Sequence, residues 1–142
     1  MKHNPAFLAL VESILPQIKE ITVEQYQGDQ KYTLIDVRED HEWNKGHLPN
    51  AHHLGKGIIE RDIETRFPDK AMPLALYCGG GYRSAMAALN LQVMGYSEVV
   101  SVAGGYKAWL ESLTSGSRFI LDMEQLIGEN SALLDQGLLF YY

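Results

Sequence analysis

Residues 73–84 read Pro-Leu-Ala-Leu-Tyr-Cys-Gly-Gly-Gly-Tyr-Arg-Ser and decide the fold of this chain. The apolar run 73–77 predicts a buried strand, and a helical stretch begins near Arg83. Cys78, the only cysteine in the chain, therefore falls at the carboxyl end of a strand. In α/β sheets, ligands gather at that end of the strands.

Three glycines follow the cysteine and shape the predicted loop. Gly79, Gly80 and Gly81 let the backbone turn through positive φ without a Cβ clash, so successive N–H groups can converge on one anion. The start of the next helix adds free N–H donors and the positive end of the helix dipole, which favours a thiolate. The planar guanidinium of Arg83 suits an oxyanion. The pattern indicates that Cys78 is a nucleophile beneath an anion site.

Simpler interpretations exist for the same residues. A lone cysteine is often a small buried apolar residue, and a lone arginine is often a surface charge. The glycines and Arg83 together favour a catalytic Cys78. Ser84 is either a helix N-cap or a substrate contact, and Tyr82 points either into the mouth of the loop or out to solvent. These two alternatives stay open.

Composition narrows the class of protein. The chain has 142 residues, 46% hydrophobic and 21% charged, as expected for one soluble globular domain. The net charge of −6 disfavours nonspecific binding to nucleic acid or to an anionic membrane. A single cysteine excludes an internal disulfide and fits a reducing compartment. The first residues lack signal-peptide features, and no apolar run is long enough to span a bilayer. We expect a cytoplasmic protein without a membrane partner.

Strands alternate with short helices along the chain. The predicted strands are 32–37, 52–54, 73–77 and 98–102. The predicted helices lie between Asn4 and Ile18 (divided by Pro16), after a capping box at Thr22 and Gln25, from Asp40 to Gly46, over 59–67, from Arg83 to Gly95, and after Gly104-Gly105. The alternation predicts a largely parallel α/β sheet, with Arg38 and Cys78 on one rim.

The chain divides into three parts. Residues 1–21 are predicted as an N-terminal helical extension, 22–114 as the catalytic domain, and 115–142 as a tail after the Ser115-Gly116-Ser117 break. The tail is predicted to be helical. It ends in the apolar run 138–142, which we expect to pack on the domain or on a second subunit. A homodimer through the tail is therefore one expectation.

Several motifs occur in a fixed order along residues 22–113. They are Leu34-Ile-Asp-Val-Arg38, Glu42-Trp43, Gly46-His-Leu-Pro-Asn-Ala51, Leu76–Ser84, Gly95-Tyr96 and Gly104-Gly-Tyr-Lys-Ala-Trp109. As an ordered set they resemble the rhodanese domain, a sulfurtransferase module. The resemblance implies a single-domain, three-layer fold in which helices flank a largely parallel five-stranded sheet.

The resemblance also implies a ping-pong sulfur transfer that needs no cofactor. Cys78 would take the outer sulfur of thiosulfate or a polysulfide and pass it to cyanide, a small thiol or a protein thiol. The backbone N–H groups of residues 80–83 would hold the persulfide, and Arg83 would orient the sulfonate of thiosulfate. An oxyanion-type donor of this kind is worth about 2.7–4 kcal/mol in a transition state.

Supporting roles are expected for three residues near the rim. We expect Asp36 to bond loop groups or Arg83, and Arg38 to pair with Glu42. The alternative is a solvated ion pair worth about 0–1 kcal/mol. Lys56, Glu60 and Arg61 are candidates to line the mouth, in orientations that the sequence does not fix.

Other functions were weighed against the same residues. A non-catalytic or persulfide-carrying interaction module is compatible with the apolar tail. A small phosphatase or arsenate reductase is disfavoured, because four residues separate Cys78 from Arg83 and the phosphatases of this superfamily have one more. His52 and His53 suggest a metal, but they lack helical spacing and a second cysteine nearby. We therefore expect no metal.

Overall fold

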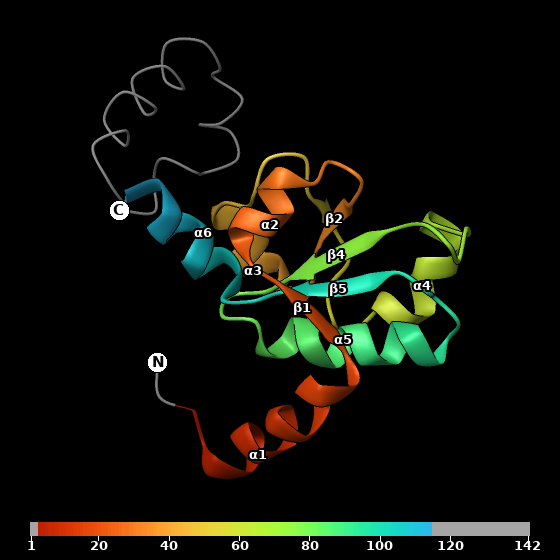
Figure 1. The fold of residues 1–142 in the computed structure, drawn as a ribbon, viewed down its shortest axis with the longest axis horizontal. Coiled ribbons are helices and arrows are strands. Elements are labelled where there is room, and N and C mark those ends of the chain that lie inside the picture. The colour runs from red at the N-terminus through yellow and green to blue at the C-terminus, as the bar shows by residue number, and fades with distance from the viewer. Residues whose placement is uncertain (1–2, 115–142) are drawn as a thin grey trace, which may run out of the picture.

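A computed structural model describes residues 3–114, which form a five-stranded sheet flanked by helices (Figure 1). The strands are β1 (Lys19–Ile21), β2 (Thr33–Asp36), β3 (His52–His53), β4 (Leu74–Tyr77) and β5 (Val99–Val102). Their order in the sheet is β1-β5-β4-β2-β3, and every neighbouring pair is parallel. The predicted parallel α/β architecture is confirmed.

Helices cover both faces of the sheet. They are α1 (Pro5–Ile14), a 3₁₀ turn η1 (Leu15–Gln17), α2 (Val23–Gly28), α3 (Asp40–Lys45), α4 (Ile59–Arg66), α5 (Tyr82–Val93) and α6 (Gly105–Thr114). Figure 1 shows α4 and α5 on one face and α2 and α6 on the other, with α1 outside α5. The described chain is thus a three-layer fold to which α1 is added.

Alternation along β4 builds the two halves of the core. Leu74, Leu76 and Cys78 belong to the cluster beneath α4 and α5. Ala75 and Tyr77 belong to the cluster beneath α2 and α6. All five are fully or almost fully buried, as expected for a central parallel strand with helices on both faces.

Local signals set most helix ends. The capping box before α2 is formed: Gln25 N–H donates to Thr22 Oγ1 at 3.0 Å, and Thr22 N–H donates to Gln25 Oε1 at 2.8 Å. Pro16 lies in η1, so the N-terminal helix is divided as predicted. Asp40 is also a candidate N-cap in the sequence, but the N-cap of α3 is Glu39 and Asp40 is the first residue of the helix.

The edge strand β1 was missed from the sequence. It has three residues, of which only Ile21 is buried, so neither an alternating nor a continuous apolar pattern marks it. It pairs with β5 through Lys19 and Val100. The segment 1–21, predicted as helical, therefore supplies an edge strand to the sheet.

The structure bears on the prediction about membrane-spanning segments but not on the prediction about the C-terminal tail. The tail 115–142, with its expected dimer contact, lies outside the described residues. Among residues 3–114, no helix has the length and apolar character needed to cross a membrane.

Candidate active site

Cys78 lies directly after β4, on the floor of a cavity of about 340 Å³. Its side chain is 1% exposed. The sulfur receives the N–H of Gly81 at 3.1 Å and the N–H of Ser84 at 3.4 Å, and the Ser84 hydroxyl lies at 3.5 Å. Three hydrogen-bonding groups therefore converge on the sulfur atom.

The donor set differs in part from the prediction. The Gly81 amide was expected and is present. Ser84 is the third residue of α5 and is fully buried, whereas the N-cap of that helix is Gly81. The N-cap interpretation of Ser84 is therefore wrong, and its amide and hydroxyl both face the sulfur.

The start of α6 is hydrogen-bonded to the backbone of the cysteine loop. Tyr106 N–H donates to the Cys78 carbonyl at 2.8 Å, and Lys107 N–H donates to the Gly79 carbonyl at 3.1 Å. A Cβ on Gly105, whose φ is +52°, would overlap that Cys78 carbonyl. With these carbonyls fixed toward α6, the later amides of the loop are free to face the sulfur.

A second buried hydroxyl extends the contacts of the sulfur. Ser101 lies in β5, is fully buried, and has its Oγ 2.8 Å from Ser84 Oγ. Either hydroxyl can donate to the other. When Ser101 donates, the proton of Ser84 is free to point at Cys78, so the pair forms a short chain that ends at the sulfur.

Arg83 and Glu42 form a two-pronged ion pair at the side of the cavity. The Nη1–Oε1 distance is 2.7 Å and the Nη2–Oε2 distance is 3.0 Å. Hydrogen bonding from Arg83 lowers the pKa of Glu42 from 4.5 to about 2, and Glu42 in turn raises the pKa of Arg83. The nearby Cys78 also contributes to the raised pKa of Arg83.

The predicted pairing of Arg38 with Glu42 is wrong. Arg38 instead pairs with Asp36, with Nη2–Oδ2 at 2.8 Å, and both side chains are almost completely buried. Asp36 also accepts the Arg38 backbone N–H, and Arg38 donates to the Gly46 carbonyl. Asp36 therefore bonds to a loop group as expected, but that group belongs to the loop after β2 and not to the cysteine loop. A buried arginine prefers the nearest buried carboxylate, which satisfies its fork and its charge together.

A larger hollow of about 540 Å³ adjoins the cysteine cavity. Its lining includes His3, Glu42, Tyr82, Arg83, Lys107 and Glu111. Tyr82 lines both spaces, so it faces the mouth. Gly79 and Gly80 also line the hollow.

The three further candidates for the mouth lie elsewhere. Lys56 lines a separate hollow beside Arg38 and His53. Glu60 accepts a hydrogen bond from Asn90, and Arg61 pairs with Asp62. Lys56 lies beside the end of β2, the other two lie on α4, and none of the three lines the cavity that holds Cys78.

Several residues of the site were missed in the sequence. Ser101 is a polar residue inside the apolar run 99–102, and that interruption was the available signal. His3, Phe7 and Lys107 have no local signal that ties them to Cys78. Only the packing of α1 and α6 brings His3 and Phe7 to the cavity and Lys107 to the adjoining hollow. Among residues 3–114, no three His, Cys, Asp or Glu side chains group closely enough to hold a metal.

Comparison with known proteins places the chain among sulfur-handling proteins. The family model described as a rhodanese-like domain matches residues 21–112. The putative sulfurtransferase YtwF of Bacillus subtilis is 37% identical over 97 residues, covering 66% of this chain and 91% of that protein. The thiosulfate sulfurtransferase GlpE of Pseudomonas syringae is 35% identical over 97 residues, covering 67% and 90%.

A solved structure agrees with the fold. The polysulfide-sulfur transferase homodimer of Wolinella succinogenes superposes with a TM-score of 0.62 at 25% identity, covering 75% of this chain and 83% of that chain. The family match extends over most of the described residues and includes the whole cysteine loop. This chain is a member of the rhodanese-like domain family.

Proposed function

We propose that this protein is a sulfurtransferase that carries a sulfane sulfur on Cys78 as a persulfide. The observation that carries the proposal is the convergence of the Gly81 amide, the Ser84 amide and the Ser84 hydroxyl on Sγ. Donors fixed around a sulfur stabilise its anionic form, which is the nucleophile. The names of YtwF and GlpE support the same reaction class.

The first half-reaction transfers a sulfur to the enzyme. The Cys78 thiolate attacks the outer sulfur of thiosulfate or a polysulfide, a new S–S bond forms, and the donor's own S–S bond breaks. Sulfite or the shortened polysulfide leaves with the electron pair. Arg83 is positioned to offset the negative charge at this step, since it lines the cavity beside the sulfur.

The second half-reaction returns the enzyme to its thiolate. A thiophilic acceptor, such as cyanide or a small or protein thiolate, attacks the outer sulfur of the persulfide. The S–S bond breaks and Cys78 keeps the electron pair. The amides of Gly81 and Ser84, which face Sγ, stabilise the thiolate that is released in this step.

Intact mass measurement tests the proposal directly. Incubation with thiosulfate or inorganic polysulfide is expected to add one sulfur, which dithiothreitol removes. Cys78 is the only cysteine, so Cys78→Ser is expected to abolish the gain completely. An unchanged mass of the wild type with thiosulfate, polysulfide and an organic persulfide would refute the proposal.

Two alternative functions predict different results. A protein that gains a sulfur but releases it only to a protein thiol is a persulfide carrier. Cys78-dependent hydrolysis of an aryl phosphate would indicate a phosphatase. The spacing of four residues between Cys78 and Arg83 disfavours the phosphatase.

A further inference from the structure

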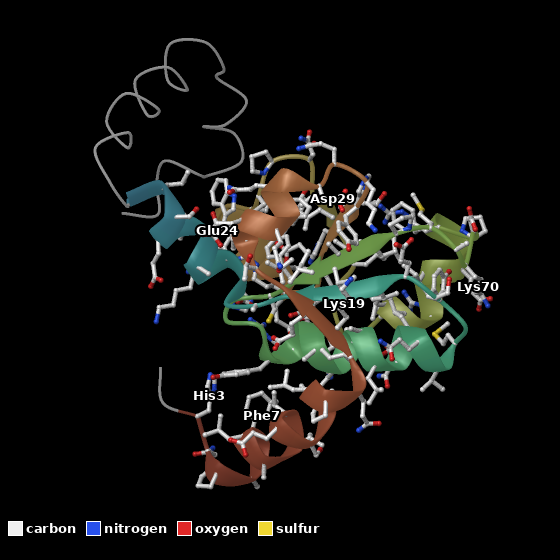
Figure 2. All side chains as sticks on the ribbon, in the orientation of Figure 1. His3, Phe7, Lys19, Glu24, Asp29 and Lys70 are labelled. Carbon is white, nitrogen blue, oxygen red and sulfur yellow. The ribbon has the colours of Figure 1, made fainter. Side chains whose placement is uncertain are left out.

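Three aromatic rings form one wall of the cavity above Cys78, here called the aromatic wall: His3, Phe7 and Tyr82. The ring centroids of His3 and Tyr82 are 4.7 Å apart, those of His3 and Phe7 5.3 Å, and those of Phe7 and Tyr82 6.0 Å. Figure 2 shows His3 and Phe7 on the side of α1 that faces the beginning of α5. The wall is therefore a continuous aromatic surface in the cavity that Cys78 also lines.

Two of the three rings come from outside the family domain. The family match begins at residue 21, whereas His3 and Phe7 lie before and within α1. The helix is anchored by Val11 and Ile14, which are 1% and 8% exposed, and it packs against α5. This addition to the domain is thus held in place by its own core contacts and brings two rings to the cavity.

The charged residues that line the cavity carry little net charge, because Glu42 and Arg83 form an ion pair. Since Glu42 offsets part of the charge of Arg83, the pair attracts an inorganic anion less strongly than a free arginine would. An organic group finds three rings with which it can stack or make sulfur–aromatic contacts.

We propose that the aromatic wall selects sulfur compounds in which the transferred sulfur is attached to an organic, preferably aromatic or bulky apolar, group. The inference rests on the proposed sulfurtransferase function and names its substrate class. His3 and Phe7 act on specificity, since they contact the part of the donor that leaves. They take no part in bond making.

Thiosulfonates provide a matched pair of probes. Benzenethiosulfonate and methanethiosulfonate carry the same sulfane sulfur on an –SO₂– group and differ only in phenyl against methyl. In each case the Cys78 thiolate forms a bond to the sulfane sulfur, the S–SO₂ bond breaks, and the sulfinate leaves with the electron pair. Cyanide then removes the sulfur as thiocyanate, which is measured.

The wild type is expected to favour benzenethiosulfonate in kcat/KM by about tenfold or more, the range that a few apolar contacts produce. Phe7→Ala is expected to lower that ratio about tenfold and His3→Ala by about threefold, mainly through a loss of kcat/KM with benzenethiosulfonate. Leu10→Ala is the matched control. Leu10 is on the same helix, 50% exposed, and is expected to leave the ratio as in the wild type.

The outcomes separate the inference from the function on which it rests. Equal use of both probes by an active wild type overturns the inference and leaves the sulfurtransferase intact. A preference that survives both Phe7→Ala and His3→Ala also overturns it. If Phe7→Ala fails to fold by circular dichroism, His3→Ala and Phe7→Leu decide. If no donor forms a persulfide, the proposed function itself falls.

Discussion

The loops that follow β2 and β4 start from neighbouring positions on one rim but have different roles. Asp36 and Tyr77, the last residues of the two strands, are register partners. Each loop then supplies an arginine that pairs with a carboxylate. Arg38 is 2% exposed and its partner Asp36 is fully buried, whereas Arg83 is 31% exposed and Glu42 25%.

The difference separates a pair that is held inside the domain from a pair that faces a cavity. Arg38 donates to Asp36 and the Gly46 carbonyl, and its guanidinium carbon lies 4.4 Å from the centre of the Tyr106 ring. These contacts fix the arginine inside the domain. Arg83 meets a single carboxylate and faces a cavity. Access to a cavity, rather than the presence of charge, therefore distinguishes the β4 loop, where we propose the site.

The largest effect is expected when the buried pair is broken. Asp36→Ala leaves the Arg38 charge buried without its carboxylate, and such a change typically costs about 3–5 kcal/mol. The free energy of unfolding from urea titration measures it. A loss below about 1 kcal/mol would show that Asp36 is dispensable.

Arg83→Ala provides the contrasting change at the β4 loop. The partly exposed pair is expected to contribute only about 0–1 kcal/mol to the free energy of unfolding. The same variant is expected to lower kcat/KM with thiosulfate about 100-fold, and to affect a polysulfide donor less, because polysulfide has no sulfonate. Equal losses with both donors would contradict a role of Arg83 toward the sulfonate.

The next largest effect concerns the contact between α6 and the cysteine loop. Gly105→Ala places a Cβ against the Cys78 carbonyl at a positive φ, so the loop must shift. We expect a loss of about 1–3 kcal/mol in the free energy of unfolding and at least a tenfold loss of persulfide formation. Gly57→Ala is the control, since nothing lies within 4 Å of the added Cβ and the φ is not in the left-handed region. Wild-type activity in Gly105→Ala would show that α6 does not fix the loop.

Acid is expected to weaken the Arg83 region selectively. The pKa of Glu42 is about 2 in the folded protein and 4.5 without its partner, so its pairing stabilises the fold above pH 4.5. That contribution is lost as the pH falls toward 2.

Unfolding temperatures of the wild type and Glu42→Gln test this sign. At about pH 6 we expect the wild type to unfold about 5 °C higher, and at about pH 3 we expect the gap to narrow. A gap that is constant or that widens toward acid would contradict the lowered pKa of Glu42.

The sequence predicted most of the fold because the central strands and helix caps are local features. The run 73–77 is uniformly apolar, and the Thr22–Gln25 capping box needs only three residues of spacing. The edge strand β1 was missed because its stability comes from pairing with β5. The approach of the Gly81 amide to Cys78 was predictable, because the two residues lie together in the chain. The predicted partner of Arg38 was wrong, because relative burial decides the pairing and spacing does not.

The smallest effect is expected at the far end of the serine chain. Ser101 Oγ is 2.8 Å from Ser84 Oγ, which lies 3.5 Å from the Cys78 sulfur. Ser101→Ala removes the hydroxyl that can orient Ser84 but leaves the two loop amides on the sulfur. Since one hydrogen bond contributes about 0.5–1.5 kcal/mol, we expect alkylation by iodoacetamide to slow by about three- to tenfold.

Ser84→Ala should have the larger effect of the two, because it removes the group next to the sulfur. Ser97→Ala, at an exposed serine bonded to the Lys70 carbonyl, is the control and is expected to react like the wild type. If alkylation is slowed in Ser84→Ala but unchanged in Ser101→Ala, the hydrogen bonds that matter to the sulfur come only from the β4 loop and α5. The contrast between the two loops would then be sharper, because β5 would contribute only packing to the site.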